Sequence, residues 1–280
     1  MGGHAIKEAV PFTYEEGLEI HSHMLNFFRD VLGKDIVYEI KIVGSWANDF
    51  SKKCWGDMDF VVQIPERSSP KSYYQYFKDR CFRTFEWGSG PVFNEGLGII
   101  SVPCKVHNKI HQVDLILTKN IRYAEWIHCV DTASKYSAAY RNILLMAFVY
   151  CKSFEPIEMY FAEDGNEIPL TWKREFLDIQ FGLMRGMQTR RGASRPICKT
   201  RHTFDKVLIT NNLLDIHMHI FGSATYYDTR SRDFESLFYW IKDKDPKCMW
   251  VFSVALKNFK RLKMEIPEEM LTYFPKEDIT

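Results

Sequence analysis

The sequence predicts an α+β protein with two domains, and three observations support this prediction. Up to about Ile121, segments that alternate with a period of two are interspersed with segments of helical period. Beyond Ile121 only helical patterns follow. Asp57 and Asp59 stand one residue apart in an otherwise apolar predicted strand. We therefore expect a mixed domain over residues 1–130 and an all-helical domain over residues 131–280.

Local signals predict the helices of the first domain. Thr13 and Glu16 have the spacing of a capping box, which begins a helix, and Gly33 is a typical stop. A second helix is predicted to begin at Ser69-Pro70 and to continue to about Phe85. The side chains expected on the inner faces of these two helices are Leu18, Leu25, Phe28, Leu32, Tyr74, Phe77 and Cys81.

Alternating apolar residues predict the strands of the first domain. A short helix is expected between the first two strands, after Gly44-Ser45, and His107-Asn108-Lys109 is expected to join the last two as a hairpin. The predicted strands are Ile36–Val43, Asp57–Ile64, Leu97–Val106 and Ile110–Thr118.

Asp57 and Asp59 are expected to project from the same face of their strand, because side chains alternate across a strand. Met58 and Phe60 then point into a core on the opposite face. Two adjacent carboxylates repel each other unless a cation lies between them, and hard oxygen ligands suit Mg²⁺ or Mn²⁺. The pair therefore indicates a metal site, and a solvated strand edge is the alternative interpretation.

Two further features strengthen this interpretation. The Gly44-Ser45 turn offers backbone N–H groups and a hydroxyl, which are typical ligands of a phosphate. Asp114 is a single carboxylate in the middle of a predicted apolar strand, whereas an ordinary structural Asp is more often found at a strand end or in a turn. A metal site beside a phosphate site predicts a nucleoside triphosphate as the substrate.

The totals limit the classes of function. The chain has 280 residues, of which 46% are hydrophobic and 26% charged, as in ordinary globular proteins. The formal net charge is +1, so any contact with nucleic acid has to come from a local patch. Seven cysteines without a CxxC motif favour reduced thiols and a cytoplasmic location. No apolar run approaches the length of about 20 residues that a membrane span needs, and no signal-peptide pattern opens the chain.

Helical periodicity predicts five helices in the second domain, and one basic segment interrupts them. This segment, between Arg185 and Lys206, contains seven Lys or Arg residues and a single acidic one. We expect a loop between two helices that either binds a triphosphate or the backbone of a nucleic acid by its charge, or is simply solvated. The five predicted helices are Ser134–Phe154, Trp172–Gln188, Thr203–Phe221, Arg232–Lys242 and Pro246–Met264.

The segment from Val43 to Phe60 resembles the nucleotidyltransferase superfamily of DNA polymerase beta. The family pattern is an apolar residue, Gly-Ser, a spacer, Asp-apolar-Asp-apolar and a third carboxylate on a later strand. Gly44-Ser45, Asp57-Met58-Asp59-Phe60 and Asp114 match it in order, over about residues 36–118. The resemblance implies a palm with a mixed sheet flanked by helices. A following helical domain is common in poly(A) polymerases and tRNA nucleotidyltransferases.

The resemblance also implies an activity and its residues. Asp57, Asp59 and Asp114 are the expected metal ligands and catalytic residues for two Mg²⁺ or Mn²⁺ ions, and Asp114 is also a candidate general base. The expected nucleotide-binding residues are Gly44, Ser45, Trp46, Lys135 and Arg141. The candidate nucleic-acid-binding residues are Arg185, Arg190, Arg191, Arg195, Lys199 and Arg201.

Three functions remain open at this level. The first is template-independent transfer of a nucleotide to an RNA 3′ end, with a nucleoside triphosphate and RNA as partners. The second is the same transfer to a small molecule, a protein hydroxyl or a second nucleotide. The third is a non-catalytic nucleotide-binding module.

Overall fold

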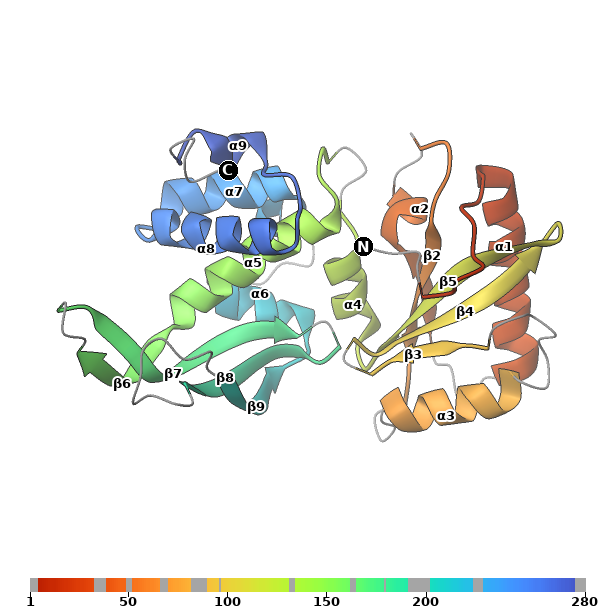
Figure 1. The fold of residues 1–280 in the computed structure, drawn as a ribbon, viewed down its shortest axis with the longest axis horizontal. Coiled ribbons are helices and arrows are strands. Elements are labelled where there is room, and N and C mark those ends of the chain that lie inside the picture. The colour runs from red at the N-terminus through yellow and green to blue at the C-terminus, as the bar shows by residue number, and fades with distance from the viewer. Residues whose placement is uncertain are drawn as a thin grey trace. The chain divides into compact units, whose positions relative to one another are not determined.

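The computed structural model confirms the α+β class. It describes residues 5–32, 39–48, 52–65, 70–81, 90–95, 97–130, 134–161, 165–178, 180–190, 202–223 and 229–274. The chain divides into two compact units, residues 1–133 and residues 134–280 (Figure 1). In the described part of the chain, no helix is long and apolar enough to cross a membrane.

The first unit contains a five-stranded mixed sheet flanked by helices, as expected. The strand order is β1-β2-β5-β4-β3, in which β2 and β5 run parallel and the other neighbours are antiparallel. The strands are β1 (Ile40–Val43), β2 (Asp57–Gln63), β3 (Val92–Asn94), β4 (Ile99–Val106) and β5 (Lys109–Thr118). The helices are α1 (Tyr14–Phe27), α2 (Gly44–Asn48), α3 (Pro70–Cys81) and α4 (Ile121–His128), and a π-helical turn, η1 (Phe28–Leu32), extends α1.

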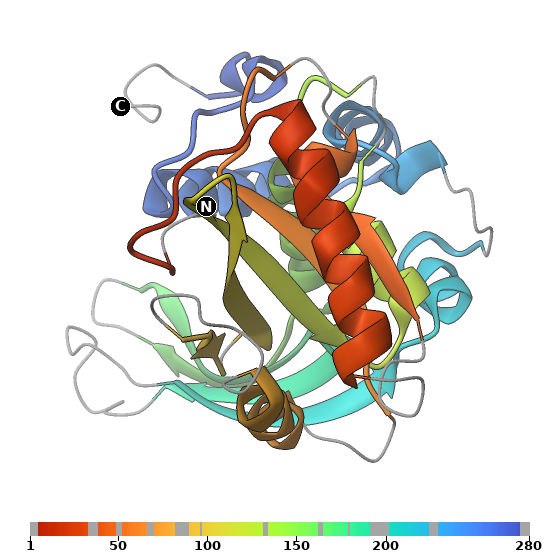
Figure 2. The same cartoon turned by 90° about the vertical axis from the view of Figure 1, so that its right-hand side faces the viewer.

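Helix α1 crosses one face of the sheet (Figure 2). Its capping box is confirmed, because Thr13 and Glu16 each accept a backbone N–H of the other. The prediction of its inner face is wrong for Leu18 and Leu25, which are about half exposed. The buried residues of α1 are Glu16, Gly17, Ile20, Met24 and Phe27.

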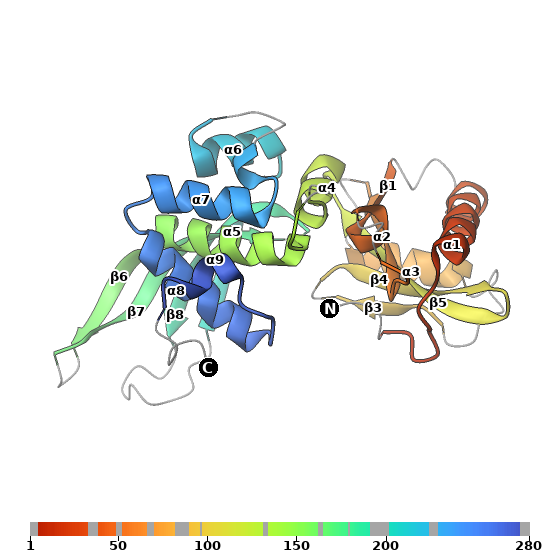
Figure 3. The ribbon, with the colours of Figure 1, turned by 90° about the horizontal axis from the view of Figure 1, so that it is seen from above.

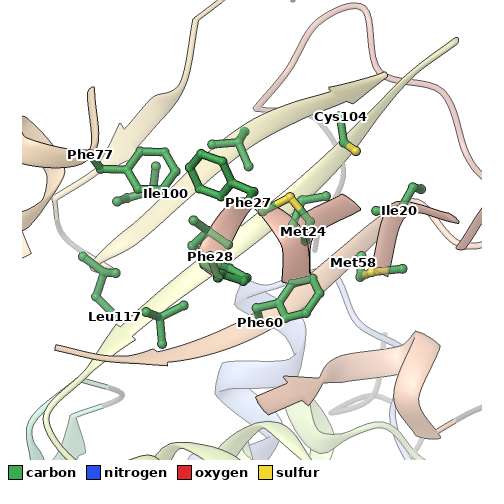
Figure 4. Packing of buried hydrophobic residues seen from close by; sticks show 14 of the residues in the cluster. Ile20, Met24, Phe27, Phe28, Met58, Phe60, Phe77, Ile100, Cys104 and Leu117 are labelled. Atoms are coloured by element: carbon green, nitrogen blue, oxygen red, sulfur yellow. The ribbon is translucent and has the colours of Figure 1, made fainter. Parts of the chain in front are cut away.

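Apolar side chains from α1 and α3 form the main core on this face of the sheet. Met24 and Phe27 from α1 meet Phe77 from α3 above Met58 and Phe60 of β2 (Figure 4). All of these side chains are buried. The alternation predicted for β2 is confirmed: residues 58, 60, 62 and 64 point into this core. Asp57 and Asp59 consequently point to the other face.

The other face of the sheet is apolar at one end and acidic at the other. Val61 of β2 and Ile116 of β5 pack there against Ile121 and Ala124 of α4. Two residues earlier on each strand, the same face carries Asp59 and Asp114. The apolar end of this face packs against α4, and the acidic end carries the candidate metal ligands.

The predicted hairpin between β4 and β5 is confirmed. His107 and Asn108 both have positive φ, 48° and 61°, as a two-residue turn of type I′ requires. The turn sets the register in which Ser101 of β4 stands opposite Asp114 of β5. It therefore helps to place the third carboxylate.

The second unit has helices, as predicted, but it is not all-helical. It also contains a four-stranded antiparallel sheet of order β6-β7-β8-β9 (Figure 3). The strands are β6 (Glu155–Phe161), β7 (Glu167–Asp178), β8 (Gly182–Arg190) and β9 (His202–Thr210). The helices are α5 (Ala138–Ser153), α6 (Leu213–Phe221), α7 (Phe234–Lys244), α8 (Cys248–Arg261) and α9 (Glu268–Leu271), with a 3-10 turn, η2 (Thr229–Ser231).

Two of the five predicted helices of this unit are therefore wrong in whole or in part. Residues 172–188 form β7, a turn and β8 instead of a helix, and the predicted helix 203–221 is a strand in its first half. Gly182 interrupts the predicted helix at residues 172–188, because its φ is +107°. A Cβ added there would lie only 2.5 Å from the Thr210 carbonyl oxygen. The predicted helices over residues 134–154, 232–242 and 246–264 are confirmed by α5, α7 and α8.

Candidate metal centre

Three carboxylates converge where β2 and β5 lie side by side. Asp57 and Asp59 stand on β2, and Asp114 stands on β5 directly opposite Asp59. Because the two strands are parallel neighbours, matched positions project from the same face. Asp57 and Asp59 are half-buried and Asp114 is buried. The three residues thus form one cluster on the face opposite the main core.

The geometry of this cluster fits a metal ion. One carboxylate oxygen of each residue lies within 4.8 Å of the other two. All three donors are hard, anionic oxygens, which suit Mg²⁺ and Mn²⁺ better than they suit softer metals. The donor set and its spacing therefore suit a hard divalent ion.

Gly44 leaves room for the cluster. It begins α2 with a φ of +75°, directly after Val43, which pairs with Asp59 across the antiparallel strands. A Cβ added at Gly44 would overlap Oδ2 of Asp59. The turn thus requires glycine for two reasons, its backbone conformation and its close approach to the carboxylate.

The electrostatics of the cluster are those of carboxylates packed together. Burial, followed by the charges of Asp57 and Asp114, raises the pKa of Asp59 well above its ordinary range. Burial and the charge of Asp57 raise the pKa of Asp114 to about 6, although hydrogen bonds from Ser101 and Gln112 oppose the increase. A divalent cation would relieve this repulsion, because it favours the ionised form of each ligand.

Gln112 and Ser101 orient Asp114, a role that no sequence motif predicted for either residue. Gln112 Nε2 donates to both carboxylate oxygens of Asp114, at 2.9 and 3.1 Å. Ser101 contributes a further side-chain hydrogen bond. A signal was present, because Gln112 is a polar residue on the same face of an apolar strand as Asp114.

The turn after β1 contains Ser45 and Trp46, two of the predicted nucleotide-binding residues. The Trp46 indole is 8% exposed and stacks on Tyr14, with ring centroids 6.0 Å apart. The Ser45 carbonyl accepts a hydrogen bond of 3.3 Å from Trp55 Nε1. The Trp46 side chain is therefore part of the core.

Lys135 and Arg141 lie in the second unit. Lys135 precedes α5 and forms an exposed ion pair with Glu268, with Nζ to Oε2 at 2.8 Å. Arg141 is 1% exposed and donates to the Ser231 carbonyl at 3.4 Å. The buried guanidinium of Arg141 presents no surface to a nucleotide in this arrangement.

The basic segment begins within strand β8 and ends within strand β9, and is not a loop between two helices as predicted. Arg185 is on β8, where its Nη2 contacts Glu175 Oε1 at 2.7 Å. Arg190 is the last residue of β8. The predicted binding residues outside the described part of the chain are Arg191, Arg195, Lys199 and Arg201.

Arg185 also lines a hollow of about 510 Å³ within the second unit. Its anionic side chains include Glu175, whose Oε2 lies 2.5 Å from His219 Nε2. The Lys, Arg and Glu residues that line the hollow are Lys152, Lys173, Arg174, Arg185, Glu155 and Glu175. Positive charge exceeds negative charge in this set.

Among known proteins, this chain has structural neighbours but no relative recognised by sequence. The sequence matches no known family and no curated protein. Among solved structures, the chain is similar to a polymerase beta of Leishmania infantum in a ternary P/T complex, with a TM-score of 0.39 and 16% identity. The similarity covers 58% of this chain and 59% of that chain. Because this TM-score is below 0.5, we base the function on the geometry of the site alone.

Proposed function

We propose that this protein is a metal-dependent nucleotidyltransferase. It transfers a nucleoside monophosphate from a nucleoside triphosphate to an acceptor hydroxyl and releases pyrophosphate. The observation that carries the proposal is the cluster of Asp57, Asp59 and Asp114 on one face of adjacent parallel strands, beside a turn that needs glycine. Three carboxylates within 4.8 Å of one another are costly to bury without cations.

Each residue of the cluster has its own role in this proposal. Asp57, Asp59 and Asp114 would hold two Mg²⁺ or Mn²⁺ ions. When bound, the ions lower the pKa of that hydroxyl and neutralise the leaving pyrophosphate. Asp114 accepts the hydroxyl proton as the acceptor oxygen bonds to the α-phosphorus and the bond to the β-phosphate breaks.

The nucleotide contacts in this proposal come from the turn after β1. The Ser45 hydroxyl and the backbone N–H groups from Gly44 to Trp46 bind the β- and γ-phosphates. The proximity of Gly44 to Asp59 places this turn beside the metal ligands, where the phosphates of a metal-bound nucleotide have to lie.

For the acceptor, we propose the 3′ end of an RNA, which is extended without a template and is bound by basic side chains of the second unit. Positive charge in the hollow beside Arg185 and in the basic β8–β9 connection supports this choice. Phosphodiester backbones are attracted to such charge, whereas most small-molecule acceptors carry fewer phosphates.

The activity is tested by incubating the protein with each of four α-labelled ribonucleotides, Mg²⁺ or Mn²⁺, and RNA. Label in long RNA with one nucleotide supports the RNA-end transferase. Label in a small product formed without RNA supports the transferase activity but shows that the acceptor is a small molecule and not RNA. Absence of metal-dependent transfer to RNA, small molecules or protein refutes the activity and leaves a nucleotide-binding module. Asp59→Asn is the inactive control.

The RNA acceptor is tested separately with Lys173→Ala, a change in the hollow. We expect the KM for RNA to rise several-fold while the KM for the nucleotide stays constant. Lys257→Ala, which removes an exposed charge from α8, is the matched control. An unchanged KM for RNA in Lys173→Ala would argue against the hollow as part of the acceptor site.

A further inference from the structure

The segment from Ala5 to Phe12 connects the starts of the two strands that carry the carboxylates. Phe12 exchanges two backbone hydrogen bonds with Trp55, at 2.9 and 3.0 Å, and Trp55 lies two residues before Asp57. The Val10 N–H donates to the Ile110 carbonyl at 2.9 Å, near the start of β5. One short stretch of backbone therefore contacts the chain just before β2 and the first residues of β5.

Gln112 extends this connection to a carboxylate of the cluster. Its Oε1 accepts the backbone N–H groups of Ala5 and Ile6, at 3.0 and 3.1 Å. Its Nε2 donates to both oxygens of Asp114. The Gln112 side chain is 1% exposed, so both ends of the amide find their partners inside the protein. A single side chain thus bridges the N-terminal segment and Asp114.

This bridge restricts Asp114 more than packing alone does. A buried amide group that lost its hydrogen-bond partner would be left unsatisfied away from water, which is unfavourable, so the bridge is held at both ends. Ile6 is 1% exposed, and its buried side chain anchors the segment beside the N–H groups that Gln112 accepts. The two carboxylate oxygens have four lone pairs between them, and the bonds from Gln112 and Ser101 leave one for a metal ion.

We propose that Gln112 is a positioning residue of the metal centre and that residues 5–12 form its supporting segment. The amide holds the Asp114 carboxylate in the orientation that binds a metal ion, and the segment holds the amide. The proposal rests on the proposed function only in assigning a metal ion to Asp114. Because coupling between two sites is reciprocal, metal binding in turn tightens the contact of Ala5 and Ile6 with Gln112.

The test compares Gln112→Met with Gln63→Met. Methionine keeps the length of the side chain and removes the amide. Gln63 lies on the neighbouring strand β2, where its Nε2 donates to the Lys119 carbonyl at 3.3 Å, away from the carboxylates. Mn²⁺ affinity is measured by titration, and hydrogen exchange is measured at the amides of Ala5 and Ile6. Thermal unfolding verifies that both variants are folded.

We expect Gln112→Met to weaken Mn²⁺ binding by about 10- to 100-fold, the usual effect of losing a residue that orients a metal ligand. Mn²⁺ should slow exchange at Ala5 and Ile6 in the native protein and in Gln63→Met, but not in Gln112→Met. A purely structural role for Gln112 would lower the unfolding temperature without this selective loss of coupling.

Three results would overturn the proposal in distinguishable ways. Native Mn²⁺ affinity in folded Gln112→Met refutes the positioning role and leaves the proposed function intact. Exchange at Ala5 and Ile6 that does not respond to Mn²⁺ in the native protein refutes the supporting segment. A native protein that does not bind Mn²⁺ refutes the metal centre itself. If Gln112→Met does not fold, Ala5→Pro removes one donor to the amide and should weaken Mn²⁺ binding to a smaller extent.

Discussion

The Asp59 carboxylate occupies the space in which a side chain at Gly44 would lie. This relationship joins the phosphate-binding turn of the proposed site to its metal ligands. It also explains why the two features occur together in the sequence, since a turn that passes so close to a carboxylate has no room for a Cβ atom. Asp59 lies on β2, and Gly44 begins α2 directly after β1, the strand that pairs with β2.

The first prediction concerns Gly44. Gly44→Ala should lower the unfolding temperature, because alanine at positive φ costs about 1–2 kcal/mol and its Cβ displaces Asp59. It should also weaken Mn²⁺ binding. Gly56→Ala is the matched control: Gly56 directly precedes Asp57, and an added Cβ would meet no atom within 4 Å. Equal effects of the two changes would contradict the close approach of Gly44.

The second prediction concerns the central carboxylate. Asp59→Ala should abolish nucleotide transfer and leave the unfolding temperature of the metal-free protein unchanged or slightly higher. The reason is that the change removes a carboxyl group whose ionised form is disfavoured by burial and repelled by two neighbouring carboxylates. Turnover and thermal unfolding are the measurements, and Asp243→Ala, at an exposed position of α7, is the control. Near-native turnover in Asp59→Ala would refute the site.

The third prediction is a pH dependence of the metal-free protein. The pKa of Asp114 is about 6 in the folded protein, whereas an unfolded Asp titrates near about 3.9. The folded state therefore binds more protons between these values, so the contribution of Asp114 to stability falls as pH rises from about 4 through about 6. This contribution is on the order of 3 kcal/mol, since one pKa unit corresponds to about 1.4 kcal/mol.

Asp114→Asn isolates this effect. The free energy of unfolding of the variant, relative to the native protein, should increase between pH 4 and pH 7 in the absence of metal. Saturating Mn²⁺ should reverse the trend in the native protein, because the metal binds only the deprotonated carboxylates. A difference between variant and native protein that does not change with pH would contradict the raised pKa.

The fourth prediction separates Arg141 from a nucleotide site. Arg141→Leu should destabilise the protein by about 1–3 kcal/mol, because it leaves the buried Ser231 carbonyl without this donor. The affinity of the folded variant for nucleotide should stay native. Lys135→Met, at an exposed ion pair, should change the unfolding temperature little. Loss of nucleotide affinity in folded Arg141→Leu would instead support the role expected from the sequence.

The sequence was most informative where a local pattern has one structural meaning. The capping box of α1, the alternation of β2 and the hairpin at His107-Asn108 are as expected, although Lys109 belongs to β5 and not to the turn. The placement of Asp57 and Asp59 on one face follows from the period of a strand, so the pair could be recognised from the chain alone. The prediction of the inner face of α1 is wrong for Leu18 and Leu25, because these two residues are as apolar as the residues of α1 that are buried.

The second unit shows where local patterns are insufficient. The apolar residues between Trp172 and Gln188 fit a helix and a pair of strands equally well, and the choice depends on neighbours that the local sequence does not contain. Strand β7 lies between β6 and β8, and these pairings decide its conformation. Gly182 and Gly186, both poor helix formers, were the signal against a helix.

The pair Asp57 and Asp59, the third carboxylate Asp114, the glycine turn and the strands that carry them can be predicted from the sequence alone, because each depends on a short local pattern or on one residue's conformation. Only the tertiary structure decided that β2 and β5 are parallel neighbours with Asp59 opposite Asp114. It alone decided that Gln112 joins Asp114 to Ala5 and Ile6, more than a hundred residues earlier. Such contacts depend on how distant strands pair, and pairing between distant strands is a property of the folded chain as a whole.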